Sequence, residues 1–248
     1  MRPVRILRTF AAAVLIIFAG YAALFIAPDE ATMHAIQRIF YFHLPSWIAS
    51  FTAFTIVFIA NISWLVTRRK NWDALGVAAA EVGVICCTIG LITGPLWARP
   101  VWGIWWTWDA RLTTTFILWL LYISYLLLRG LLEDPERRAT LSAVFGIFAF
   151  LDVPLVYVSN RLWRTQHPQP VILGGANSGL DPTMAKVLLL CVVAVLCIMA
   201  LVLVDRFRLE MLRREFDELQ QQVESRAEEA ARMPPSPAPN FQSGGAQP

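Results

Sequence analysis

The sequence predicts an all-α integral membrane protein with six transmembrane helices and with both termini in the cytoplasm. Of its 248 residues 57% are hydrophobic, and the mean hydropathy of +0.54 is far above that of a soluble domain. Six apolar runs are each close to the length of about 20 residues that crosses a bilayer. A tryptophan-rich segment at residues 97–113 lies between the third and fourth runs and is unlike any other part of the chain.

Taken in order, the predicted spans are residues 9–27, 45–67, 74–96, 112–128, 139–158 and 183–204. The first run follows Arg2, Arg5 and Arg8, so a cleaved signal peptide is an alternative, but its length favours a retained helix. Pro45 is expected to start the second span. The spans form one transmembrane domain over residues 1–204.

The C-terminal part of the chain is predicted to be cytoplasmic. Residues 205–232 form an amphipathic helix whose apolar residues recur every three or four positions, a pattern typical of a short coiled-coil seam. The seam consists of Leu209, Leu212, Phe216, Leu219 and Val223. The tail at residues 233–248 is rich in Pro, Ser and Gly and is predicted to be disordered.

The distribution of basic residues predicts the orientation. With the N-terminus inside, all but six of the 21 Lys and Arg residues lie on the cytoplasmic side. The Trp-rich segment then lies on the outer side of the membrane, together with the three histidines, His34, His43 and His167. The cytoplasmic loops contain no Gly-rich phosphate-binding motif, so this chain should not hydrolyse ATP, and the clustered Arg residues indicate topology rather than nucleic-acid binding.

The Trp-rich segment reads WARPVWGIWWTWDARLT, and its aromatic and charged residues are candidate ligand contacts. They are Trp97, Trp102, Trp105, Trp106, Trp108, Arg99, Asp109 and Arg111. A helix entered at Pro100 would put three of the Trp residues and Asp109 on one face, whereas Gly103 favours an irregular loop instead. Large flat rings suit a large, flat and mostly apolar ligand. An aromatic belt at the membrane interface is the alternative, but five Trp residues exceed what anchoring requires.

The histidines indicate which flat ligand this is. His43 lies before Pro45 and His167 before Pro168, so each can hold an imidazole at the outer mouth of the bundle. Two imidazoles facing each other across a planar macrocycle is one way in which proteins bind haem iron. The chain therefore predicts non-covalent binding of haem b, with His43 and His167 as axial ligands of the iron and no covalent chemistry of its own.

Other polar residues are assigned secondary roles. Arg99, Arg111 and Arg38 would pair with the haem propionates, because guanidinium groups match carboxylates. His34 is interpreted as a polar interfacial residue. Two carboxylates fall inside predicted spans, where burial is costly. We expect Glu81 to pair with a neighbouring helix, and Asp152, near a kink at Pro154, to lie close to the outer pocket.

The motifs resemble those of a known family. WGIWWTWDARLT resembles the tryptophan-rich "WWD" motif of haem-handling membrane proteins, and IFYFHLP, TGPLWARPVWG and RTQHPQP resemble the flanking segments of the haem exporter protein C (CcmC) family of cytochrome c maturation. The resemblance covers about residues 28–204. Ala98 and the segment PQPVILGG depart from the family pattern.

The resemblance implies a haem-binding protein of the bacterial inner membrane that presents haem to a periplasmic haem chaperone. It implies axial ligation by His43 and His167, and a platform that also serves for docking of the chaperone. The platform residues are Trp102, Trp105, Trp106, Trp108 and Asp109. The further partners that it implies are the ATPase and membrane subunits of an ABC transporter and a small single-helix membrane subunit.

Two other functions are considered. An electron-transfer subunit with bis-histidine haem would carry histidines inside its helices, and none of the predicted spans contains one. A transporter of a quinone-like aromatic substrate would explain the Trp residues but not the histidines. It also predicts helices interrupted near the midplane of the membrane, which the sequence does not indicate.

Overall fold

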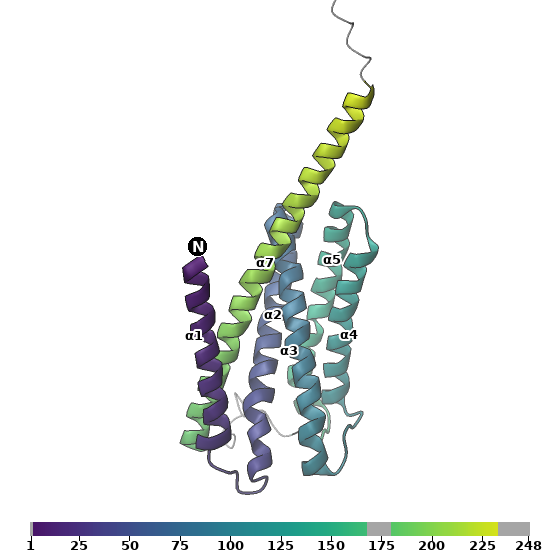
Figure 1. Ribbon diagram of the computed structural model, residues 1–248. Coiled ribbons are helices and arrows are strands. Elements are labelled where there is room, and N and C mark those ends of the chain that lie inside the picture. The colour runs from purple at the N-terminus through teal and green to yellow at the C-terminus, as the bar shows by residue number, and fades with distance from the viewer. Residues whose placement is uncertain (1, 168–179, 233–248) are drawn as a thin grey trace, which may run out of the picture. The chain divides into compact units, whose positions relative to one another are not determined.

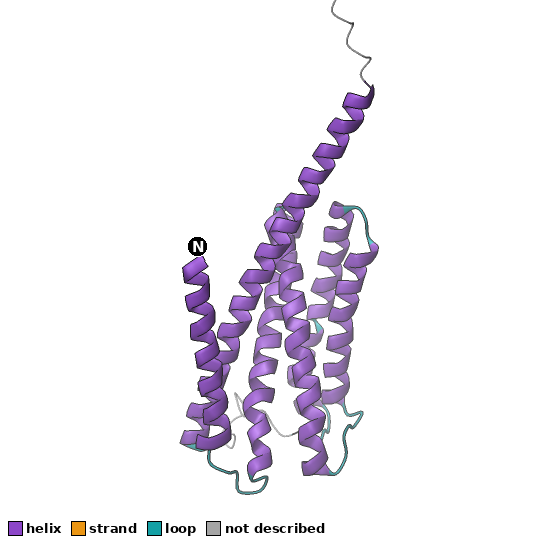
Figure 2. Cartoon of the chain, in the orientation of Figure 1, coloured by secondary structure: helices purple, strands orange, loops and turns teal. Residues whose placement is uncertain are grey.

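The computed structural model describes residues 2–167 and 180–232, and its regular elements are all helices (Figures 1 and 2). In chain order they are α1 (Arg2–Tyr21), the π-helical η1 (Ala22–Ile26), the 3-10 helix η2 (Ala35–Ile39), α2 (Phe40–Thr67), α3 (Lys70–Trp102), α4 (Ala110–Leu131), α5 (Pro135–Phe150), α6 (Asp152–Leu162) and α7 (Pro182–Arg232).

Six helical segments in the described residues are long and apolar enough to cross a membrane. They correspond to α1 with η1, η2 with α2, α3, α4, α5 with α6, and α7. This confirms the prediction of an all-helical chain with six candidate membrane spans. Residues 103–109 form the connection between α3 and α4, here called the Trp-rich loop, and it lies within the Trp-rich segment, as predicted.

The second span begins earlier than predicted. The 3-10 helix η2 leads directly into α2 at Phe40, so Pro45 lies inside α2 rather than at its start. The chain is already helical when it reaches Pro45, and the proline removes only the hydrogen bond to the carbonyl group four residues earlier. His43 therefore lies on a helix, and the expectation that it precedes one was wrong.

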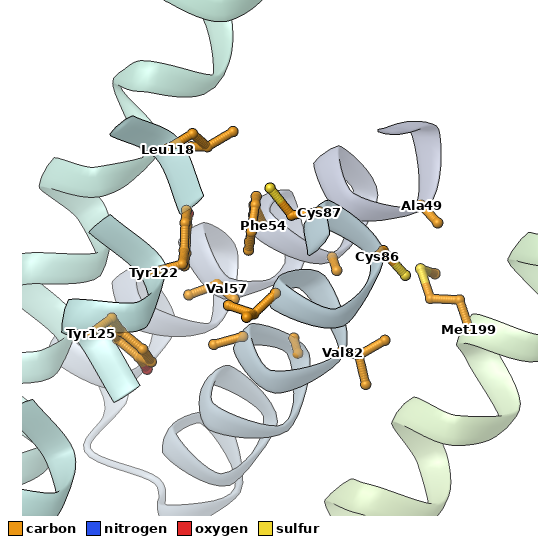
Figure 3. Close-up of a cluster of buried hydrophobic side chains, with 14 of the residues drawn as sticks. Ala49, Phe54, Val57, Val82, Cys86, Cys87, Leu118, Tyr122, Tyr125 and Met199 are labelled. Carbon is orange, nitrogen blue, oxygen red and sulfur yellow. The ribbon is translucent and has the colours of Figure 1, made fainter. Parts of the chain in front are cut away.

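The main core lies between α2, α3 and α4 (Figure 3). Phe54 of α2 stacks on Tyr122 of α4, with ring centroids 3.6 Å apart and an angle of 7° between the planes. Gly83 of α3 faces the same ring, because a Cβ atom at this position would lie 2.5 Å from Cε1 of Phe54. Small residues at such a contact let helices approach closely, which is how helices associate within a bilayer.

A second core joins α1 and η1 to α7. Ala19, Ala23 and Cys191 are buried in this cluster, and the Cys191 thiol donates to the Ala19 carbonyl. At the other end of the same helices, Arg8 of α1 pairs with Asp205 of α7 at 2.8 Å. α7 is therefore joined to the first helix by both apolar and ionic contacts.

The two carboxylates inside the predicted spans have different surroundings. Glu81 of α3 pairs with Arg206 of α7, which confirms the expected interaction with a neighbouring helix. Asp152 is buried at the start of α6, immediately after a break in the helix at Leu151. Pro154 supplies no N–H group to the Phe150 carbonyl, which accounts for the break.

The chain divides into two compact units after Glu210. The second unit is described as far as Arg232 and is helical over that range. Four of its apolar residues are exposed: Leu212, Phe216, Leu219 and Val223. The interpretation of these residues as a coiled-coil seam stays a prediction, and the predicted disordered tail lies outside the described residues.

Candidate functional site

The Trp-rich segment is an irregular loop between two helices. α3 continues through Pro95 and Pro100 to Trp102 and ends at Gly103, whose φ of 77° is in the left-handed region that favours glycine. α4 begins at Ala110. The interpretation of the segment as one helix with the Trp side chains on a single face was therefore wrong, and the loop alternative was correct.

Four aromatic side chains from this loop and from α4 form a cluster. The rings of Trp106 and Trp108 lie edge to face at 5.8 Å, and both meet Phe116 of α4 at about the same angle. Phe116 in turn stacks on Trp119 at 6.0 Å. The indole N–H group of Trp119 donates to the hydroxyl of Thr88 on α3, at 2.9 Å. This bond holds the cluster against α3.

The cluster lines an apolar pocket of about 400 Å³ between α3 and α4. Leu91, Ile92 and Pro95 of α3 form the opposite wall, and almost all of the lining is apolar. Pockets for apolar ligands are commonly built in this way, from aromatic and aliphatic side chains with few polar groups. Flat aromatic walls suit a flat aromatic ligand.

The sequence alone did not identify Phe116 and Trp119 as part of the site. They lie three residues apart in an apolar run, where aromatic residues also face lipid, so their spacing carries no signal of a pocket. Their position about two to three turns after Asp109, on the helix that follows the Trp-rich loop, was the only hint available.

The remaining Trp residues of the segment lie in different surroundings. Trp105 is 56% exposed, and the guanidinium group of Arg99 lies over its ring. Trp102 is partly buried in the last turn of α3. Trp97 packs edge to face against Phe40 and against His43, with ring centroids 6.1 and 5.9 Å away. The structure thus places Trp97 beside a histidine.

His43 is partly buried and held from two sides. Its imidazole lies between the edges of Trp47 and Trp97, and its Nδ1 atom is 2.9 Å from the hydroxyl oxygen of Thr93. The Thr93 hydroxyl donates its own proton to the Ile89 carbonyl at 2.8 Å. We therefore infer that Nδ1–H of His43 is the donor to Thr93. The lone pair of the neutral ring then lies on Nε2.

His167 is positioned by a different kind of contact. It lies in an irregular segment after α6, and its main-chain N–H group donates to the Thr165 hydroxyl at 3.0 Å. The Thr165 hydroxyl donates in turn to Oδ2 of Asp109, at 2.8 Å. His167 and Arg111 both lie close enough to His43 to interact with it electrostatically.

Asp109 accepts hydrogen bonds at both carboxylate oxygens. Oδ1 caps α4 through the Leu112 amide at 3.0 Å, and Oδ2 accepts from Thr107, from Thr165 and, at 3.4 Å, from the Gln166 amide. Burial by itself would raise the pKa of Asp109, but these bonds outweigh it and hold the pKa below its usual value. Asp109 is therefore ionised near neutral pH.

The two arginines of the segment bind main-chain carbonyl groups. Arg111 reaches from α4 to α6 and donates to the carbonyls of Val156 and Tyr157, the latter at 3.3 Å. Arg99 donates to the carbonyl of Gly103 and so closes the end of α3. The predicted pairing of these side chains with propionates stays a prediction.

Arg38 and His34 lie in or next to the connection between α1 and α2. Arg38 pairs with Asp29 at 3.0 Å and donates to the Leu24 carbonyl. His34 is exposed, has a positive φ of 50°, and donates its main-chain N–H group to the Glu30 carbonyl. These contacts give both residues a local structural role.

Comparison with known proteins gives the family. A sequence profile of heme exporter protein C matches residues 2–222. The chain is 33% identical to heme exporter protein C of Bradyrhizobium diazoefficiens over 224 residues, which are 90% of this chain and 85% of the relative. It is 30% identical to the Haemophilus influenzae protein of that name over 72% of each chain, and 28% identical to the Escherichia coli protein over 64% of this chain and 63% of the relative. The chain thus belongs to the heme exporter protein C family and is a non-enzymatic, multi-helix membrane protein of cytochrome c biogenesis.

Proposed function

We propose that this protein binds haem b non-covalently at the Trp-rich end of its helical bundle, with His43 and His167 as the two axial ligands of the iron. The hydrogen bond from His43 to Thr93 carries the proposal. A histidine that ligates a metal through one ring nitrogen almost always donates the other N–H group to a fixed acceptor. Thr93 is such an acceptor, and it leaves Nε2 of His43 available as a ligand.

The aromatic residues supply the surface for the macrocycle. The apolar pocket lined by Trp106, Trp108, Phe116 and Trp119 offers flat walls close in sequence to Asp109, and Trp97 covers one side of His43. Trp102 and Trp105 extend this surface at the end of α3. Arg99 and Arg111 are the cations nearest in sequence to these rings. Each would give up its hydrogen bond to a main-chain carbonyl and pair with a haem propionate instead.

The site faces the periplasm in this proposal. All but six of the Lys and Arg residues would then lie on the cytoplasmic side of the bacterial inner membrane. Haem held there would be presented to a periplasmic haem chaperone. The proposed assembly also contains the ATPase and membrane subunits of an ABC transporter and a small single-helix subunit.

Electron transfer is the second candidate, because His43 lies inside a candidate membrane span. The argument that no span contains a histidine therefore fails. A different argument stands against this candidate. The chain has three histidines, all in segments at the Trp-rich end, so the opposite end has no histidine with which to hold a second haem.

Absorption spectroscopy of the detergent-purified protein with added ferric haem b tests the proposal. The wild-type protein is expected to give a low-spin spectrum typical of two histidine ligands. His43→Ala and His167→Ala should each convert the spectrum to high-spin or abolish binding, because each removes one ligand. His34→Ala is the matched control and should leave the spectrum unchanged. Identical low-spin spectra for all four proteins would show that other ligands hold the iron.

A further inference from the structure

We propose that Asp109 is a positioning residue that holds His167 in place through Thr165. Its predicted role was as part of the ligand-contacting platform, but both of its oxygens face groups of the protein. The inference rests on the proposed role of His167 as a haem ligand. It assigns to Asp109 and Thr165 a function that acts on that ligand rather than on haem itself.

The first argument is the local structure around His167. α6 ends at Leu162, and residues 163–167 contain no regular secondary structure. A ligand on such a segment is not oriented by helical hydrogen bonds, unlike His43 on α2. The segment must therefore obtain its position from contacts with another part of the chain.

Asp109 makes these contacts. Its Oδ2 atom accepts from the Thr165 hydroxyl at 2.8 Å and from the Gln166 amide at 3.4 Å, across 56 and 57 positions of the sequence. The Thr165 hydroxyl also accepts from the His167 amide at 3.0 Å. Three consecutive residues that end at His167 are thus connected, directly or through one hydroxyl, to a single carboxylate.

The carboxylate is itself fixed. Oδ1 of Asp109 caps α4 by accepting from the Leu112 amide, so the first turn of a transmembrane helix holds the side chain. An ionised carboxylate accepts hydrogen bonds only, and such bonds are stronger than those between neutral groups. The arrangement is a short chain of hydrogen bonds from the start of α4 to the main chain of His167.

Four variants of the full-length protein test this assignment. Thr165→Val keeps the volume of the side chain but removes the hydroxyl, and Thr165→Ser restores it. Asp109→Asn keeps an oxygen that can cap α4. It replaces Oδ2 with an amide NH2 group, which cannot accept the hydrogen bond from Thr165. Thr107→Val is the matched control, because it removes one hydrogen bond to the same carboxylate without touching residues 165–167.

The first measurement is the spectrum with added ferric haem b. Thr165→Val and Asp109→Asn should lose most of the low-spin signal, and added imidazole should restore it by replacing the misplaced ligand. Thr165→Ser and Thr107→Val should resemble the wild type. If the wild type shows the predicted spectrum and Thr165→Val matches it without imidazole, the positioning role is excluded.

The second measurement needs no haem. In the protein without haem, hydrogen–deuterium exchange over residues 164–167 should be about tenfold faster in Thr165→Val and Asp109→Asn, which corresponds to the loss of roughly one hydrogen bond. Unchanged exchange in both variants would overturn the proposed connection. A different result is faster exchange in both variants together with a low-spin spectrum that persists in His167→Ala. That result would support the connection but refute the assignment of His167 as an iron ligand.

Discussion

At the scale of single residues, two threonine hydroxyls control the histidines of the proposed site. Thr93 accepts from the ring of His43, and Thr165 accepts from the main chain of His167. Each hydroxyl also donates a hydrogen bond to a fixed acceptor. The acceptor of Thr93 is the Ile89 carbonyl on α3, and the acceptor of Thr165 is Asp109 at the start of α4. The Thr93 hydroxyl therefore orients the imidazole ring of His43, and the Thr165 hydroxyl holds the main chain of His167.

Replacement of Thr93 tests this control at His43. Thr93→Val should weaken haem binding by about 10–100-fold, because the ring loses the acceptor that fixes its tautomer and orientation. Thr93→Ser should keep the wild-type affinity. A titration of the purified protein with ferric haem b, followed by absorbance, measures the effect.

Thr52→Val provides the control for this experiment. Thr52 lies on the same helix as His43 and donates only to the Ile48 carbonyl, so its loss removes a hydroxyl from α2 without contact to the histidine. Equal affinities of Thr93→Val and Thr52→Val would contradict the role assigned to Thr93.

At the residue scale, the sequence predicted candidate ligand contacts, which stay predictions, but not the hydrogen bonds that connect them. The two histidines, the Trp residues and Asp109 were selected because their types suit a flat iron-containing ligand. Thr165 was not selected, because a hydroxyl 56 positions from Asp109 carries no local signal of a contact. Only the fold brings the two side chains together.

At the scale of the helices, the close approach of α2 and α3 supports the site. Gly83 leaves room for the ring of Phe54, which stacks on Tyr122. This packing holds together the helices that carry His43 and Thr93. A change in the α2–α3 distance would therefore also change the distance between these two residues.

A matched pair of glycine variants measures the packing. Gly83→Ala adds a methyl group where the stacked Phe54 ring cannot easily move, and should destabilise the fold by about 1–3 kcal/mol. Gly130→Ala adds the same group to α4 where nothing lies within 4 Å, and should be neutral or slightly stabilising. Thermal unfolding in detergent compares them. A Gly83→Ala protein as stable as Gly130→Ala would show that the helices pack less closely than described.

The helix ends were the least predictable elements. Pro45 and Pro100 were both interpreted as helix starts, because proline is favoured in the first turn. In the structure both lie inside helices, near an end where the loss of one hydrogen bond is tolerated. The apolar middle of each span was predicted correctly, because the length and composition that a bilayer requires can be read directly from the sequence.

At the scale of the whole protein, α4 connects two loops of opposite character. The Trp-rich loop precedes this helix, and the charged turn around Asp134 follows it. The distribution of basic residues predicts that the first loop is periplasmic and the second cytoplasmic.

Labelling with a membrane-impermeant maleimide tests this orientation. Ile104→Cys lies in the Trp-rich loop and Glu133→Cys in the charged turn, and both positions are exposed. In intact spheroplasts only Ile104→Cys should react, and Glu133→Cys should react after the membrane is permeabilised. The unmodified protein controls for the four natural cysteines, which lie within candidate membrane spans. The opposite labelling pattern would reverse the proposed topology.

The two proposed ligands also differ in how firmly the fold holds them. His43 is part of α2, a candidate membrane span, so its displacement requires movement of a packed core. His167 lies in an irregular segment that is connected through the Thr165 hydroxyl to the carboxylate of Asp109, and a docking protein can compete for these hydrogen bonds without disturbing a helix. On the proposed assignment, retention and release of the cargo are thus divided between the two sides of the iron. Delivery of haem would begin on the His167 side of the iron, while His43 still prevents the escape of haem into the membrane.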